Sequence, residues 1–269
     1  MVYYKTFDEI ELIRENCLLV SKTLALVASL IKPGITGKEI DVKAEEFIRD
    51  HGAVPGFKGY RDFPATLCIS PNECIVHGIP SDKEFQDGDV VSVDCGVYNN
   101  EYYGDAAFTF ALGNVETEVM ELLTVTNESL YKGIEMAKVG GRLGDIGWAI
   151  QDHTQTKHGY GVVRELVGHG LGRNLHEKPE VPNYGKRGKG PMLKEGLVIA
   201  IEPMINLGTK SIRASRDGWT IETKDRKVSA HYEHTVAVRK NGPDILSDHS
   251  YIIEAIKNNA EINEIPIKK

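Results

Sequence analysis

The stretch VVSVDCGVYNNEYYGDAAFTFAL (Val90–Leu112) decides the fold of this chain. Two segments rich in β-branched and aromatic residues flank Asn99-Asn100, a pair that tolerates the positive φ angles of a two-residue hairpin turn. The pattern therefore predicts an antiparallel hairpin centred on that pair. In this register Asp94 lies directly opposite Asp105 on one face, with the two Cβ atoms about 5 Å apart.

Two carboxylates that face each other on a buried surface are unfavourable, because like charges repel and burial removes their hydration. Three arrangements would relieve the conflict. The groups could share a proton as an acid–base dyad, although the DTG-type motif of aspartic proteases is missing. They could be a structural pair bonded to backbone or water, or a cation could lie between them. We favour the cation, because further candidate ligands follow in the sequence.

Three later residues are the candidate ligands. Glu202 ends the apolar strand LVIAI, Glu233 lies in the β-prone segment SAHYEHTVAV, and His169 sits between glycines in GHGLG. Alone, each has an ordinary explanation as a turn or edge-strand residue. With Asp94 and Asp105 they make four carboxylates and one imidazole, which suit two bridged divalent ions of Mn, Fe, Co or Zn. The lack of thiolate ligands argues against a structural zinc site.

Two capping boxes mark helix starts in the first part of the chain. Thr6 followed by Glu9 opens an apolar-rich helix that runs through Leu30. Thr36 followed by Glu39 opens a second helix, which ends near His51-Gly52. Strand-like segments are expected next, at about 65–69 and 74–77, before the hairpin.

The same order of patterns then recurs. KVGGRLGDI (138–146) echoes KPGITGKEI (32–40), and EGLVIAIE (195–202) lines up with DGDVVSVD (87–94). This alignment places Glu202 over Asp94, and a weaker match places Glu233 over Asp105. The matches indicate an internal duplication because they occur in the same order, although each match alone is weak.

We therefore predict a single domain, residues 1–269, made of two pseudo-symmetric halves at about 6–112 and 113–255. Acids from both halves would converge on the cleft between them. The polar segment 257–269 is expected to be a loosely held tail.

Composition argues against several classes of protein. The chain has 269 residues, 32 Lys and Arg against 39 Asp and Glu, and a net charge of −7, which is unsuited to nucleic acid. It shows neither a signal-peptide pattern nor an apolar run of about 18 residues, so we expect no membrane association. Four cysteines without CxxC spacing indicate reduced thiols in a cytoplasmic protein. No pattern resembles a dimer seam, so we expect a monomer.

At this point the sequence resembles the methionine aminopeptidases, in particular the compact bacterial type I form. The resemblance spans nearly the whole chain and rests on five motifs in order: NECIVHGIP (72–80), DCGVYNNEYYGDAAFTF (94–110), GHGLGRNLHEKP (168–179), IEPM (201–204) and SAHYEHTVAV (229–238). It implies the α/β pita-bread fold, in which internally duplicated antiparallel sheets and flanking helices surround a dinuclear metal site.

The resemblance also implies roles for individual residues. The metal ligands would be Asp94, Asp105, His169, Glu202 and Glu233. A metal-bridging hydroxide would attack the peptide carbonyl, with Glu202 moving its proton. His77 and His176 would bind the substrate and stabilise the amide nitrogen and the developing oxyanion.

By family position, a methionine pocket would be formed by six residues. They are Phe57, Tyr60, Phe63, Cys68, Leu175 and Trp219. Two depart from the family pattern, because many relatives carry Phe at the position of Leu175 and a smaller residue at that of Phe57. Some relatives also hold a monovalent cation at the positions of Asn72, Cys74 and Ser229.

The expected function is removal of N-terminal methionine from nascent polypeptides whose second residue is small, with transient proximity to ribosomes. Two alternatives stay open. One is a pita-bread enzyme of aminopeptidase P or prolidase type, which acts before proline. The other is a non-catalytic peptide- or ribosome-binding protein on the same fold.

Overall fold

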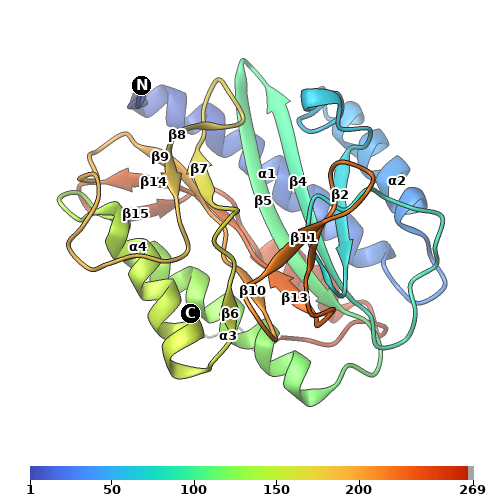
Figure 1. Cartoon of the computed structure of the whole chain (residues 1–269). Coiled ribbons are helices and arrows are strands. Elements are labelled where there is room, and N and C mark those ends of the chain that lie inside the picture. The colour runs from blue at the N-terminus through green and yellow to red at the C-terminus, as the bar shows by residue number, and fades with distance from the viewer. Residues whose placement is uncertain (266–269) are drawn as a thin grey trace.

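The computed structural model describes residues 1–265 and shows antiparallel sheets in the centre with helices packed outside them (Figure 1). The helices are α1 (Phe7–Leu30), α2 (Gly37–Asp50), α3 (Thr117–Glu135), α4 (Leu143–Gln151) and α5 (Ser250–Lys257), with short turns η1 (Tyr60–Asp62) and η2 (Asp152–Lys157). The strands before α3 are β1 (Val54–Pro55), β2 (Leu67–Pro71), β3 (Cys74–Val76), β4 (Val90–Asn99) and β5 (Tyr102–Ala111). The strands after α4 are β6 (Gly161–Val162), β7 (Gly168–Gly170), β8 (Glu177–Val181), β9 (Val198–Ile201), β10 (Met204–Asn206), β11 (Ile212–Ala214), β12 (Ile221–Thr223), β13 (Ser229–His231), β14 (His234–Arg239) and β15 (Gly242–Ile245).

Both predicted capping boxes are confirmed. The Thr6 hydroxyl accepts the Glu9 N–H at 3.3 Å while the Glu9 carboxylate accepts the Thr6 N–H at 2.8 Å, and Thr36 and Glu39 do the same before α2. Each box satisfies N–H groups that the first helical turn leaves without partners. As a result α1 and α2 begin where the sequence predicts.

The β4–β5 hairpin forms, but its predicted register is wrong by one position on each strand. Asp94 pairs with Ala107, and Asp105 pairs with Gly96. The turn residues with positive φ are Asn100 (48°) and Glu101 (66°), not Asn99 and Asn100. The two aspartates therefore lie on the same face as diagonal neighbours instead of opposite each other.

A buried asparagine of α1 accounts for this register. The amide nitrogen of Asn16 donates to the carbonyl oxygen of Asn99 at 3.0 Å and to that of Tyr102 at 2.9 Å. Because one side chain bonds both residues, Asn99 and Tyr102 are held as the last pair before the turn. Local turn preferences alone could not reveal this long-range contact.

The strands form four antiparallel sheets, in which β4 pairs with β1, β2 and β5, and β9 lies between β14 and β7. Helices α1 and α2 cover the sheet that contains β4, whereas α3 packs against β9, β10, β13 and β15 and α4 against β8 (Figure 1). Helices followed by strands thus occur twice along the chain. The internal duplication and its boundaries at 112 and 113 nevertheless remain predictions.

Hydrogen bonds join the hairpin to the later strands. The Glu233 N–H donates to the Ala107 carbonyl at 3.0 Å, and the Thr235 hydroxyl donates to the Asp105 carbonyl at 2.7 Å. One apolar core also extends from β4 and β5 to β9 and β14. Elements far apart in sequence are therefore fixed against one another where the acids converge.

The prediction of a loosely held C-terminal tail is wrong for residues 258–265. Asn259 donates to the carbonyl oxygens of Ala28 and Ile31, and the Asn263 N–H donates to Ala111 at 2.9 Å. Ile262 and Ile265 are buried. Hydrogen bonds of Asn259 and Asn263 thus attach this segment to α1 and the end of β5, and its two isoleucines are buried. Residues 266–269 lie outside the described residues. Within 1–265 no helix has the length and apolar character needed to span a membrane.

Candidate metal centre and substrate pocket

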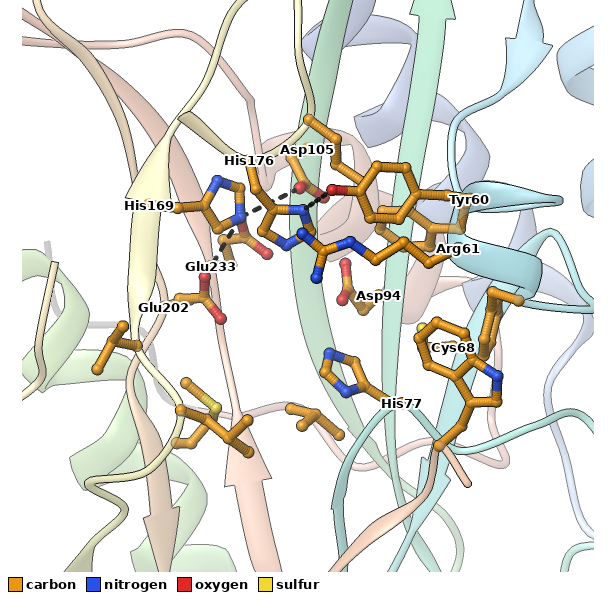
Figure 2. Close-up of a pocket in the computed structure, with 18 of the residues that line it drawn as sticks. Tyr60, Arg61, Cys68, His77, Asp94, Asp105, His169, His176, Glu202 and Glu233 are labelled. Carbon is orange, nitrogen blue, oxygen red and sulfur yellow. Dashed lines mark hydrogen bonds and ion pairs between the residues drawn. The ribbon is translucent and has the colours of Figure 1, made fainter. Parts of the chain in front are cut away.

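The five predicted metal ligands converge on one cavity (Figure 2). Asp94 and Asp105 come from the hairpin, Glu202 directly follows β9, Glu233 lies between β13 and β14, and His169 is the middle residue of β7. Nε2 of His169 lies 3.8 Å from Oδ2 of Asp105 and 3.5 Å from Oε1 of Glu202. Ligand atoms of Asp105, His169 and Glu233 all lie within 4.8 Å of one another.

His169 has the tautomer of a metal ligand. Its Nδ1 lies 2.9 Å from the carbonyl oxygen of Gly170, which can only accept, so Nδ1 carries the proton. Nε2 is then left with a lone pair directed toward the acids. Burial lowers the pKa of His169 to about 4, which keeps the ring neutral near pH 7.

Three buried carboxylate oxygens of this cluster have no hydrogen-bond partner: Oδ1 of Asp94, Oδ1 of Asp105 and Oε1 of Glu233. Buried polar atoms without partners are rare and costly, so each requires an explanation. Hard or borderline divalent cations bind carboxylate oxygens and a neutral imidazole together. The donor set therefore fits a divalent metal ion.

The pKa values of the four acids also indicate that their negative charges are unfavourable in this buried cluster. Burial raises the pKa of Asp94 to about 7. Burial first, and then the negative charge of neighbouring acids, raises the pKa of Asp105, Glu202 and Glu233 well above the ordinary value. Without a cation the four groups cannot all be ionised at neutral pH.

Two further histidines lie beside the acids. Nδ1 of His176 is 2.9 Å from the Tyr60 hydroxyl, and its ring centroid is 4.3 Å from that of His169. Burial and the neighbouring His169 lower the pKa of His176 to about 3, and burial lowers the pKa of His77. Both rings are neutral at pH 7 and can donate a hydrogen bond to a bound substrate.

Comparison with known proteins identifies the family. The model of metallopeptidase family M24 matches residues 11–240. The chain belongs to this family. It is 50% identical to a methionine aminopeptidase of Clostridium perfringens over 92% of this chain and 99% of the relative. The methionine aminopeptidase 1 of Bacillus subtilis is 47% identical over the same shares.

Solved structures of similar peptidases confirm the fold. A methionine aminopeptidase from Rickettsia prowazekii superposes with a TM-score of 0.90 at 39% identity, covering 92% of this chain and all of that one. A prolidase from Pyrococcus furiosus reaches 0.73 at 27% identity, over 91% of this chain and 65% of the prolidase. The predicted pita-bread fold is confirmed, and the protein is an enzyme of a metal-dependent peptidase family.

The six predicted pocket residues line the other part of the same M24 cavity, which has a volume of about 280 Å³. Phe63 and Trp219 meet edge to face with centroids 5.1 Å apart, and Cys68 and Leu175 are buried beside them. Phe57 fits because β4 has a glycine beneath it: a Cβ on Gly96 would lie 2.4 Å from the Phe57 ring. The pocket is thus apolar and polarisable, as a thioether requires.

His231 belongs to this M24 site, although sequence analysis did not assign it a role. It is buried, its Nε2 has no hydrogen-bond partner, and that atom lies 3.7 Å from Oε2 of Glu202. Burial lowers its pKa to about 3. The sequence does contain a signal for this role. His231 and Glu233 are two residues apart in a β-prone segment, and residues with this spacing lie on the same face of a strand.

The residues suggested for a monovalent cation do not line the cavity of the acid cluster. The Ser229 N–H donates to the Asn72 carbonyl at 2.9 Å, which brings these two residues together. The Asn72 side chain bonds Asp89 and the Val90 N–H, and the Ser229 hydroxyl lies 2.9 Å from the Asn206 side chain. Cys74 is a buried residue of β3. A cation bound here remains a prediction.

Proposed function

We propose that the protein removes N-terminal methionine from nascent polypeptides whose second residue is small, as a cytoplasmic monomer. One observation carries this proposal: the buried cluster of acids and His169 opens directly onto an apolar cavity lined by Phe63, Cys68 and Trp219. A metal-ligand set beside a pocket for one thioether side chain matches hydrolysis of the peptide bond after methionine.

We further propose that two divalent ions bind, chosen among Co, Mn, Fe and Zn. Four carboxylates are more than one divalent ion requires, which supports a pair of ions. The residues that would hold the ions are Asp94, Asp105, His169, Glu202 and Glu233, which line one cavity with His169 beside the acids. When bound, the ions would polarise the scissile carbonyl and make water a stronger nucleophile.

Glu202 is suited to hold the proton released by the attacking water. Its Oε1 lies 3.5 Å from Nε2 of His169, and burial raises the pKa of its carboxyl. The Asn183 amide donates to the Glu202 carbonyl oxygen at 2.9 Å, which fixes the backbone at this position. A positioned carboxylate with a raised pKa is an effective general base near neutral pH.

His77 and His176 would hold the scissile amide from two sides. His176 is oriented by the Tyr60 hydroxyl, and His77 has a φ of 58°, with its ring centroid 6.3 Å from that of Trp219. Neutral imidazoles placed in this way can donate to the developing oxyanion or bind the leaving nitrogen, and one donor of this kind changes rates by about 10²–10³.

The test uses protein that has been stripped with chelator and reloaded with Mn²⁺, Fe²⁺ or Co²⁺. It is then offered Met-Ala-Ser, Met-Leu-Ser and Ala-Pro-Ala. We expect cleavage of Met-Ala-Ser only, and none in the stripped protein. Cleavage of Ala-Pro-Ala would indicate an enzyme of aminopeptidase P or prolidase type. Bound metal without cleavage of any peptide would indicate a non-catalytic binding protein.

A further inference from the structure

The mouth of the cavity carries two opposite charges. Arg61 and Glu165 both line the cavity and are exposed, whereas the metal-binding acids lie deeper. The apolar end holds the methionine side chain and the acids face the scissile bond, so the rest of a bound peptide leaves through this mouth. An extended residue spans about 3.5 Å, so the third and fourth residues of the substrate lie about 3.5–7 Å beyond the second, on the way out through this mouth.

The backbone holds Arg61 in an unfavourable conformation that presents it to the cavity. Arg61 has φ 48° and ψ 37°, and Asp62 has φ 68°, so two successive residues with side chains are left-handed. The turn is closed by the Gly59 N–H, which donates to the Phe63 carbonyl at 2.8 Å, and by Phe63 N–H, which donates to Tyr60 at 3.0 Å. Conformations of this kind persist where the surroundings impose them, and they are frequent at ligand-binding sites.

The Arg61 guanidinium lies over the Tyr60 ring, 5.4 Å from its centroid. Figure 2 shows it on the side of Tyr60 that faces the cavity. Tyr60 is itself bonded to His176, so the guanidinium stands next to a side chain that binds the scissile amide. A ligand at Arg61 is therefore close enough to be part of the same bound peptide.

No ion pair within the described residues includes Arg61, although most arginines of the chain have one. Arg14, Arg49, Arg173, Arg213, Arg226 and Arg239 each lie within 4.0 Å of a carboxylate. The five N–H donors of Arg61 match a carboxylate in two-pronged geometry. Glu165, the other exposed charge that lines the cavity, accepts the Arg164 N–H and would repel such a group.

We propose that Arg61 is a specificity-determining residue that binds an acidic side chain at the third or fourth position of the substrate. This inference rests on the proposed function, because it concerns peptides cleaved after methionine. The site would take Asp or Glu carboxylates, and it would make the enzyme favour proteins with an acidic residue shortly after the small second residue. Glu165 weakens that preference by its opposite charge.

The experiment compares amidated peptides that differ in one isosteric pair: Met-Ala-Asp-Gly with Met-Ala-Asn-Gly, and Met-Ala-Gly-Asp with Met-Ala-Gly-Asn. Amidation removes the terminal carboxylate, which could itself bind Arg61. We expect kcat/KM for Asp to exceed that for Asn by about three- to fivefold at one of the two positions in low salt. The ratio should approach one at 1 M salt, since this contact is partly exposed.

Variants distinguish an effect of Arg61 on the Asp/Asn ratio from an effect of the protein's net charge. Arg61→Gln should lower the Asp/Asn ratio to about one, Arg61→Lys should retain part of it, and Glu165→Gln should raise it. Arg187→Gln is the matched control, because it removes the same charge from an exposed loop that contacts Trp148 away from the cavity. Its ratio should equal that of the unmodified enzyme.

Two outcomes would overturn the inference. One is an Asp/Asn ratio of one at both positions in the unmodified enzyme, and the other is a ratio that survives in Arg61→Gln. Each ratio can be measured only if the enzyme cleaves the Asn peptides after methionine. Either outcome would therefore overturn the role of Arg61 and leave the proposed function intact. Failure to cleave any of the four peptides would instead refute the proposed function. Melting curves establish that each variant is folded.

Discussion

Loading the stripped protein with Mn²⁺ at pH 6 should release protons from the acid cluster. Burial raises the pKa of Asp94 to about 7, so this carboxyl holds about 0.9 proton at pH 6 in the metal-free protein. A carboxylate must be ionised to bind a cation, so that proton leaves on binding. Asp105, Glu202 and Glu233 have pKa values raised well above the ordinary value and add to the release.

The nearby ligand histidine does not contribute, because burial lowers the pKa of His169 to about 4 and its ring is already neutral at pH 6. We therefore expect release of at least about one proton per protein at pH 6. By linkage, the apparent Kd for Mn²⁺ falls about tenfold per pH unit for each proton displaced. Between pH 5 and pH 6 the affinity should thus rise at least about tenfold.

The pH dependence of the free energy of unfolding also reports these shifted pKa values, but less directly. The raised pKa of Asp94 contributes stability that is present below pH 4 and lost as the pH rises toward 7. Buried neutral histidines act in the opposite direction, because a lowered pKa costs stability as the pH falls below about 6.5. The two trends overlap, so counting protons directly is the better measurement.

Titration calorimetry in two buffers of different ionisation enthalpy counts the protons. Asp94→Asn is the matched control, because it keeps the size of the side chain and removes the group that titrates at about pH 7. It should release about one proton fewer. Binding of Mn²⁺ at pH 6 without net proton release would refute the reasoning, since it would mean that the buried acids are already ionised.

Three other results are expected. Asp105→Asn should lower kcat/KM by more than about 100-fold, because it removes a proposed metal ligand. Urea unfolding of the metal-free protein should show no loss of stability, and near-normal turnover would contradict the role of Asp105. His176→Ala should lower kcat about 10²-fold or more in steady-state assays of Met-Ala-Ser, and a change confined to KM would argue for substrate binding alone. Lys5→Met should lower the free energy of unfolding by about 3–5 kcal/mol in urea, because Lys5 and Glu177 form an ion pair at 2.6 Å with side chains 5% and 4% exposed. The double variant with Glu177→Leu should recover most of that loss, and equal losses in both variants would show that the pair is not responsible.

Several features followed from short segments of sequence. The capping boxes at Thr6 and Thr36 act within three residues, so they identified the starts of α1 and α2 without any knowledge of the rest of the fold. The candidate ligands were recognisable for a similar reason. A carboxylate such as Asp94 or Glu202 in an apolar strand is costly wherever the strand packs, so its presence signals a compensating partner.

Other features depended on contacts between distant segments. The hairpin register was predicted wrongly because Asn16 of α1, not the turn, selects which residues pair. His231 joined the site only because β13 places it beside Glu202. The role inferred for Arg61 depends on a left-handed turn and on the absence of a carboxylate partner within residues 1–265, neither of which the sequence reveals.

The sequence by itself thus determined where helices start, which side chains could bind metal and which family the chain resembles. Tertiary structure decided which oxygens face His169, how the two aspartates are offset and which charges stand at the mouth of the cavity. The physical reason is range. Caps, turn preferences and burial costs act over a few residues, whereas register and site geometry are selected by hydrogen bonds and packing between segments far apart in the chain.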